Sequence, residues 1–501
     1  MNKCFVQYNN FVSGPVFSED SVSREIELIE KSTKQYEWLS PTGELFLVEL
    51  PHTVYPPRED TDFMAESLSR LGPGKGRKCL EIGTGSGVLS LFCHRQGWKV
   101  SACDINPYAV AFAGRFFSNN SAGDINLCEG GPGPDEDGLM EQWSGQGNYD
   151  LIFWNMPYIK TSVDDPQHLG PMEDAALIDT SKTNLIDITL EKLRSSNLLS
   201  QNGLGLLSIG ETYTEEDIND LCSKYGFASR IVNQLNFQDG ECLKIVAFWH
   251  PYARFPTIHR EVIPSTNSEL LNKKWPIGSS LSTDNQTKGR GRYDREWTNA
   301  PELLACSWKI GKQTTIIPGI LQILCGYLVK RSFESIAQFN QNCKVVLKWP
   351  NDLILIKDGK WGKVCGILVE SVSKGTDNQI VVGVGINISN GGKNMDAEFP
   401  IGFADWYSAA ITKEFLLTQI HSRMAGLFES IDGIPQSNFE NVKDYAYDAI
   451  EKGFYACRSV LYRNEQVSFQ RINENATVNL ISNIGQEFNC NETEDLTWLF
   501  I

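Results

Sequence analysis

Runs of strand length alternate with helix-spaced apolar residues through the first half of this 501-residue chain, and this alternation constrains the fold most. The apolar runs are 78–83, 99–104, 149–155 and 204–210, and the helical patterns are 86–96, 108–117 and 185–199. This order predicts a doubly wound α/β domain around a parallel, Rossmann-like sheet. Two further runs, 227–235 and 242–250, flank a turn signal and predict a closing hairpin with one antiparallel edge strand.

A glycine-rich turn lies between the first predicted strand and its helix. Glu81, Gly83, Gly85 and Gly87 stand in the segment EIGTGSG, and glycines there permit positive φ and close approach of a ligand. Asp104 ends the next strand, where a carboxylate can accept hydrogen bonds from both hydroxyls of a ribose. The pattern predicts an adenosine-containing cofactor, and the alternative is a purely structural glycine turn.

The strand at 149–155 ends in the sequence Asn155-Met156-Pro157-Tyr158. With the glycine turn, this end resembles class I S-adenosylmethionine-dependent methyltransferases, closest to the subgroup with an Asn-Pro-Pro-Tyr motif that methylates planar nitrogens. The resemblance implies that Glu81, the three glycines and Asp104 bind S-adenosylmethionine. It implies that Asn155, Pro157 and Tyr158 bind the methyl acceptor, with Asn155 catalytic. Met156 departs from the motif, and a simple strand-end turn is the alternative.

The segment 54–61, VYPPREDT, resembles the lead-in of glutamine methyltransferases that act on the Gly-Gly-Gln loop of translation release factors. A release factor is therefore an expected partner. Glu59, Asp60 and Thr61 equally fit a helix N-cap with an acidic first turn. An amino group of RNA or DNA is the alternative acceptor, because the motif is shared. Residues 1–45 match no pattern.

Three ordered motifs follow residue 260. They are the glycine- and arginine-rich stretch at 284–297, the KWPND segment at 348–352 and the paired runs 360–370 and 380–388. Together they resemble biotin–protein ligases, which implies an α+β catalytic domain, biotin, ATP and Mg²⁺ as cofactors, and a biotin carboxyl carrier protein as partner. A biotin-sensing regulator is the non-enzymatic alternative.

The resemblance also implies residue roles. Lys363 contacts the biotin carboxylate and the α-phosphate, Arg292 belongs to a loop that closes over the adenylate, and Asp352 helps to deprotonate the carrier lysine. The remaining residues implied to bind biotin or ATP are Ser265, Thr266, Asn267, Gln286, Gly289, Arg290, Gly291, Arg295, Trp297, Asn351, Gly366 and Asn387. Asn351 and Asp352 alternatively form only a hairpin turn.

Alternating short runs at 458–462, 466–472 and 476–481 predict a small antiparallel barrel, and biotin ligases carry a similar Src-homology-3-like barrel. The expected domains are a methyltransferase-like domain at 1–250, a ligase catalytic domain at 251–450 and a barrel cap at 451–501.

The charge distribution and the cysteine spacing indicate which binding partners and which cellular compartment to expect. Residues 1–250 hold 35 acidic and 19 basic residues, whereas the rest hold 27 and 26, so binding to nucleic acid is not expected. Thirteen cysteines without CxxC spacing argue against a disulfide framework or a zinc site and favour the cytoplasm. No apolar run is long enough to span a membrane, so no membrane partner is expected.

Overall fold

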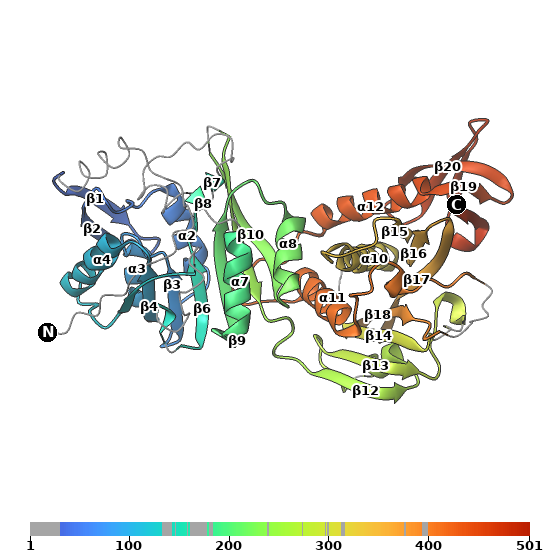
Figure 1. Cartoon of the computed structure of the whole chain (residues 1–501), viewed down its shortest axis with the longest axis horizontal. Coiled ribbons are helices and arrows are strands. Elements are labelled where there is room, and N and C mark those ends of the chain that lie inside the picture. The colour runs from blue at the N-terminus through green and yellow to red at the C-terminus, as the bar shows by residue number, and fades with distance from the viewer. Residues whose placement is uncertain are drawn as a thin grey trace, which may run out of the picture. The chain divides into compact units, whose positions relative to one another are not determined.

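The computed structural model describes most of the chain (Figure 1). The described residues are 31–132, 143–145, 147–157, 159–160, 178–179, 184–237, 240–272, 274–295, 297, 300–311, 316–374, 377–392 and 399–500. They fall into two compact units. The first unit comprises Met1–Thr214, Ile231–Ala247 and Asp432–Ile434, and the second comprises Glu215–Arg230, Phe248–Ile431 and Pro435–Ile501.

The first unit is built on a seven-stranded sheet with the order β10-β11-β9-β6-β3-β4-β5. Its strands are β3 (Lys78–Ile82), β4 (Lys99–Asp104), β5 (Asn126–Glu129), β6 (Tyr149–Trp154), β9 (Leu199–Ile209), β10 (Ala228–Asn236) and β11 (Cys242–Trp249). The pairs β3–β4, β3–β6, β4–β5 and β6–β9 are parallel, as the alternation predicts. The neighbours β10 and β11 form the predicted closing pair. Part of their turn, Gln238 and Asp239, lies outside the described residues.

Helices of the first unit begin where the sequence carries start signals. They are α2 (Glu59–Ser69), α3 (Val88–Arg95), α4 (Pro107–Asn119) and α7 (Leu185–Ser195). The first turn of α2 holds Glu59, Asp60 and Asp62, so the predicted acidic first turn is confirmed, whereas the N-cap residue is Arg58. An antiparallel pair, β1 (Lys34–Leu39) and β2 (Leu45–Leu50), precedes α2. No pattern in the sequence predicts this pair of strands.

The second unit is built on another seven-stranded sheet with the order β12-β13-β14-β18-β17-β16-β15. Its strands are β12 (Thr257–Ile263), β13 (Ser280–Gln286), β14 (Glu302–Lys309), β15 (Cys343–Lys348), β16 (Asp352–Lys357), β17 (Lys360–Lys374) and β18 (Asp377–Ser389). Only β12–β13 is parallel among these neighbours, and the other pairs are antiparallel. The short helix α9 (Thr266–Leu270) is capped by Ser265, which accepts from the Ser268 amide.

Besides α9, the described residues of the second unit form four α-helices. They are α8 (Glu215–Lys224), α10 (Pro318–Glu334), α11 (Lys413–Phe428) and α12 (Phe439–Tyr455). Helix α10 packs on β15 and β17, and α11 packs on β14. Gly326 of α10 is so close to the sheet that a Cβ there would lie 2.8 Å from Leu347 Cδ1 of β15, and it would also contact Ile367 Cδ1 of β17 at 3.9 Å. Because side chains alternate along a strand, Gly366 faces the side of the sheet away from α10.

A five-stranded antiparallel sheet follows α12, with the order β22-β21-β20-β19-β23. Its strands are β19 (Cys457–Tyr462), β20 (Glu465–Ile472), β21 (Val478–Ser482), β22 (Glu487–Cys490) and β23 (Leu496–Phe500). The three predicted strands are confirmed, and the barrel stays a prediction. Thr493 Oγ1 donates to the Trp349 carbonyl at 3.1 Å, which joins this sheet to the β15–β16 turn.

Candidate functional site

The glycine turn of the first unit has the backbone geometry that the sequence predicts. Gly83, Gly85 and Gly87 have φ of 65°, 50° and 78°. A Cβ at Gly83 would lie 2.8 Å from Trp154 Nε1, and one at Gly87 would lie 2.8 Å from Phe117 Cε1. Both the left-handed conformation and the close packing therefore require glycine at these two positions.

Asp104 lies against this turn at the end of β4. Its Oδ2 accepts from the Gly85 amide at 2.7 Å, and its Oδ1 accepts from the Asn106 amide at 2.8 Å. Burial raises the pKa of Asp104 against the opposing effect of these bonds. The carboxylate therefore fixes the glycine turn, and a ribose would have to use its remaining acceptor positions.

Glu81, which the resemblance implies binds S-adenosylmethionine, is buried inside the glycine turn. Its side chain is 2% exposed, and Oε2 accepts from the hydroxyls of Thr84 and Ser90. Burial raises the pKa of Glu81 to about 8. The carboxyl group therefore braces the turn from inside, and its proposed contact with S-adenosylmethionine stays a prediction.

Asn155 at the end of β6 is held by Asp60, which the sequence patterns place only in the lead-in segment and at the acidic start of α2. Its Nδ2 donates to Asp60 Oδ2 at 2.9 Å, which brings the lead-in segment and the strand end together. The Asn155 Oδ1 atom is buried and has no partner among the described residues, so it can accept from an incoming N–H. Met156 is buried, and Tyr158 lies outside the described residues.

A cavity of about 860 Å³ in the second unit brings together residues from segments far apart in the sequence. All the predicted biotin and ATP residues line it except Gly289. They are Ser265, Thr266, Asn267, Gln286, Arg290, Gly291, Arg292, Arg295, Trp297, Asn351, Asp352, Lys363, Gly366 and Asn387. A Cβ at Gly289 would lie 3.2 Å from Trp297 Cβ, so this glycine backs a lining residue.

One end of the cavity is a chain of neutral hydrogen bonds. Gln286 Oε1 accepts from the Thr266 amide at 2.9 Å. The Ser307 hydroxyl lies 2.7 Å from Thr266 Oγ1 and 2.6 Å from Asn267 Oδ1. These amides and hydroxyls suit a neutral polar ring such as a ureido group. Ser307 was not among the predicted site residues, because an isolated serine in an apolar strand belongs to no recognisable motif.

The indole of Trp297 lies over two glycines of neighbouring strands. A Cβ at Gly366 would lie 2.8 Å from Trp297 Cζ3, and one at Gly385 would lie 3.1 Å from Cε2. The bare backbone of β17 and β18 thus provides the floor for the ring. This arrangement can present a flat apolar face to a planar group.

Lys363, Asp352 and Lys348 form the charged centre of the cavity. Lys363 Nζ lies 2.7 Å from Asp352 Oδ1, and Lys348 Nζ lies 3.6 Å from Oδ2. Burial would raise the pKa of Asp352, but the two ammonium charges outweigh it and hold that pKa below its ordinary value. Lys348 is part of the KWPND motif, but no role was predicted for it from the sequence. Its burial and its position became visible only in the folded chain.

The arginine-rich loop lies beside this centre. Arg295 Nη2 pairs with Glu494 Oε1 at 2.7 Å, which joins the loop to the C-terminal sheet. Arg290 Nη2 pairs with Glu370 Oε1 at 3.0 Å. Arg292 Nη1 is buried and has no partner among the described residues, so it can donate to an anionic ligand.

Asn351 and Asn387 each use the side-chain NH₂ group to donate to a backbone carbonyl. Asn351 Nδ2 donates to the Ile367 carbonyl at 2.7 Å, and Asn387 Nδ2 donates to the Lys363 carbonyl at 3.3 Å. Residues 349–351 connect β15 and β16 as the hairpin alternative predicts. That turn nevertheless lines the cavity, so the two interpretations are compatible.

The geometry thus comprises a cavity in the second unit that gathers nearly all the predicted biotin and ATP residues, and a strand end in the first unit where Asn155 meets Asp60. The biotin/lipoate A/B protein ligase family matches residues 260–387. The second half thus carries a domain of this family, and the first half resembles glutamine methyltransferases.

Individual relatives match parts of the chain. Biotin–protein ligase 1 of Arabidopsis thaliana is 31% identical over 145 residues, covering 28% of this chain and 36% of that protein. The release factor glutamine methyltransferase of Salmonella typhimurium is 31% identical over 165 residues, covering 31% and 54%. The biotin protein ligase of Aquifex aeolicus with biotin and ATP aligns at a TM-score of 0.39 and 20% identity, covering 49% of this chain and 99% of that chain.

The chain spans between a quarter and about half of the length of the first curated relatives that it matches. Within the described residues, no helix is long and apolar enough to cross a membrane. No group of three or more His, Cys, Asp or Glu side chains suited to a metal occurs in that same part of the chain.

Proposed function

We propose that the second unit is an ATP-dependent biotin–protein ligase. The observation that carries this proposal is the cavity that places Lys363, Asp352 and Trp297 beside the hydrogen-bond chain of Thr266, Asn267 and Gln286. In the proposed first step, an oxygen of the biotin carboxylate attacks the α-phosphorus of MgATP. The bond from that phosphorus to the bridging oxygen of pyrophosphate breaks, and biotinyl-5′-AMP forms.

In the proposed second step, the amine of a carrier lysine attacks the acyl carbon of the adenylate, and AMP leaves. Asp352 is ionised at neutral pH, because the two lysines lower its pKa. It can therefore accept a hydrogen bond and a proton from the attacking amine, although a lowered pKa makes it a weak base. Lys363 and Arg292 offset the negative charge on the phosphoryl oxygens.

The ligase proposal is tested with the full chain, biotin, MgATP and purified biotin carboxyl carrier protein. Pyrophosphate release together with biotin on the carrier lysine is the expected result. Biotin binding without pyrophosphate release would instead support a biotin-sensing regulator. A cytoplasmic location is part of this proposal and rests on cysteine usage in the sequence.

We propose further that the first unit transfers a methyl group from S-adenosylmethionine to a protein glutamine amide, with a release factor as partner. The supporting observation is the Asn155 amide, whose Nδ2 is held by Asp60 while Oδ1 is left to accept. An acceptor NH₂ bound to Oδ1 keeps its nitrogen directed at the methyl group. The acidic surplus of residues 1–250 favours a protein over RNA or DNA.

Mass spectrometry of a release factor treated with the full chain and S-adenosylmethionine tests the acceptor. Asn155→Ala is expected to abolish transfer while calorimetry shows unchanged cofactor binding, because Asn155 is proposed to contact only the acceptor. Glu66→Gln, an exposed change on α2 outside the lead-in segment, is the control. Methylated RNA with an unmodified release factor would favour the nucleic-acid alternative.

A further inference from the structure

A helix from the first half of the sequence belongs to the second unit. Helix α8 follows β9 in the chain and precedes β10, and both strands contribute to the sheet of the first unit. The segment Glu215–Arg230 nevertheless groups by its contacts with the second unit. The domain division expected from the sequence, with a boundary at residue 250, instead assigned this segment to the first domain.

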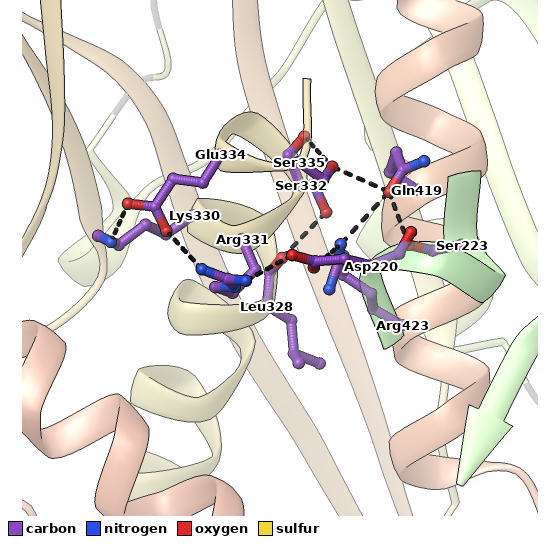
Figure 2. Close-up of polar contacts among 10 residues, drawn as sticks. All are labelled: Asp220, Ser223, Leu328, Lys330, Arg331, Ser332, Glu334, Ser335, Gln419 and Arg423. Atoms are coloured by element: carbon purple, nitrogen blue, oxygen red, sulfur yellow. Dashed lines mark hydrogen bonds and ion pairs between the residues drawn. The ribbon is translucent and has the colours of Figure 1, made fainter. Parts of the chain in front are cut away.

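The centre of the contact is one carboxylate between two arginines of different helices. Asp220 Oδ2 lies 2.5 Å from Arg331 Nη2 of α10, and Oδ1 lies 2.7 Å from Arg423 Nη2 of α11 (Figure 2). The Arg423 side chain is only 3% exposed. A buried guanidinium without its carboxylate would carry a large desolvation penalty, so Asp220 is required by both helices.

Neutral hydrogen bonds extend this contact along α8. Gln419 Oε1 accepts from the Ser223 hydroxyl at 2.8 Å and from the Ser335 hydroxyl at 3.1 Å. One amide oxygen of α11 thus joins α8 to the C-terminal end of α10, as Figure 2 shows. The first turn of α8, Glu215–Asp217, is acidic, and the charges of Arg331 and Lys330 on α10 act on Glu216.

The end of the same segment caps α11. Arg230 is buried and donates through Nε and Nη2 to the Gly426 carbonyl at 2.9 and 2.7 Å, and through Nη2 to the Glu429 carbonyl at 2.9 Å. These carbonyls lie at the helix C-terminus, where a cation is favourable. A Cβ at Gly426 would lie 2.7 Å from the Ser229 carbonyl oxygen, so the packing needs glycine there.

We infer that α10 and α11 form an interaction surface whose specific partner is the acidic segment 215–230 of the same chain. The ligase-like unit therefore requires this segment for the stability of its helical layer. The segment lies between β9 and β10 in the chain, so residues inserted between two strands of the first sheet contribute to the second unit. This inference does not depend on either proposed activity.

Hydrogen–deuterium exchange on the full chain tests the inference. In the wild-type protein, amides of α8 should show protection similar to those of α10 and α11. Asp220→Ala should raise exchange in α8, α10 and α11 together by at least about tenfold, because it takes the carboxylate from the buried Arg423 and leaves Arg331 with Glu334 alone. Asp448→Asn removes a carboxylate from an exposed pair with Lys452 and should change exchange by less than about twofold.

Two further variants make the result decisive. Asp220→Asn keeps the side-chain size and carries the same expectation if Asp220→Ala fails to fold. The double variant Asp220→Ala with Arg423→Met should recover part of the lost protection, since the buried cation is then removed as well. Rapid exchange of α8 in the wild-type protein, or a change confined to α8 in the variants, would overturn the inference.

Discussion

At the residue scale, Lys363 is the side chain on which the ligase proposal depends most. It faces Asp352 at 2.7 Å and lies 5.3 Å from the centroid of the Trp297 ring. Its compact charge can move between the carboxylate and a phosphoryl oxygen without a large rearrangement. A substitution of Lys363 therefore tests the ligase proposal more directly than a substitution of an arginine in the loop.

We predict that Lys363→Ala lowers adenylate formation by about two orders of magnitude, the usual effect of losing a transition-state charge partner. Pyrophosphate release with biotin and MgATP measures it. Lys360→Ala, an exposed change at the start of the same strand, should leave the rate unchanged. Near-normal release by the Lys363 variant would contradict the assigned role.

Glu81 gives a prediction about pH. Its pKa of about 8 in the folded protein lies above the ordinary value of 4.5 that applies after unfolding, so the folded state binds the proton more tightly. The free energy of unfolding should therefore fall as pH rises from about 4.5 to 8, by at most about 1.4 kcal/mol per pH unit from this group.

Glu81→Gln should remove this slope, because glutamine cannot ionise and still offers an acceptor to Thr84 and Ser90. The measurement is exchange of the β3 and α3 amides between pH 5 and 8, corrected for the intrinsic rate. Glu66→Gln, an exposed change on α2, serves as the control. An equal slope in the Glu81 variant and the wild-type protein would show that Glu81 is ionised throughout.

At the scale of elements, the arginine-rich loop is tied at two points. Arg290 pairs with Glu370 on β17, and Arg295 pairs with Glu494 just before β23. Arg292 lies between them and lines the cavity. The loop can thus cover an intermediate while its two ends are held, which would exclude water from a reactive anhydride.

Arg292→Gly should release biotinyl-5′-AMP into solution, because a donor to the adenylate is lost and a flexible residue replaces it. Lysines of bystander proteins should then be labelled, as measured by biotin blotting against added albumin. Lys288→Gly changes an exposed residue of the same loop that does not line the cavity. Labelling confined to the carrier in both variants would argue against a retaining role.

At the scale of the whole molecule, two compact units predict two separable responses to ligands. S-adenosylmethionine should protect β3, β4 and α3 from exchange, whereas biotin with MgATP should protect β17 and β18. At 100 times the dissociation constant, each ligand stabilises its own unit by about 2.7 kcal/mol. Exchange of the full chain with each ligand alone gives the measurement.

Two control ligands are included in the exchange experiment. Adenosine, which lacks the methionine part, is compared with S-adenosylmethionine for the first unit. MgATP without biotin is compared with biotin and MgATP for the second unit. Protection of the same strands by both ligands would contradict the assignment of one site to each unit. Protection of α8 by biotin with MgATP is expected, because α8 groups with the second unit.

Local sequence patterns determined much of the sheet of the first unit. Strand–helix alternation predicted the parallel core of the first unit, since a period of 2 or 3.6 is a property of neighbouring residues. The glycines at 83 and 87, the Ser265 cap and the acidic start of α2 follow from local sterics and hydrogen bonding. The cavity residues came from motif resemblance, and the folded chain brings nearly all of them together.

Contacts between distant residues were decided only by the tertiary structure. The polarity of Asp60 and Ser307 was visible in the sequence, but their partners lie on other elements far along the chain, and no spacing encodes such pairs. The same reason applies to α8. Its acidic pattern marks an exposed helix turn, and only the folded position of Arg331 and Arg423 makes Asp220 the carboxylate that both of them need.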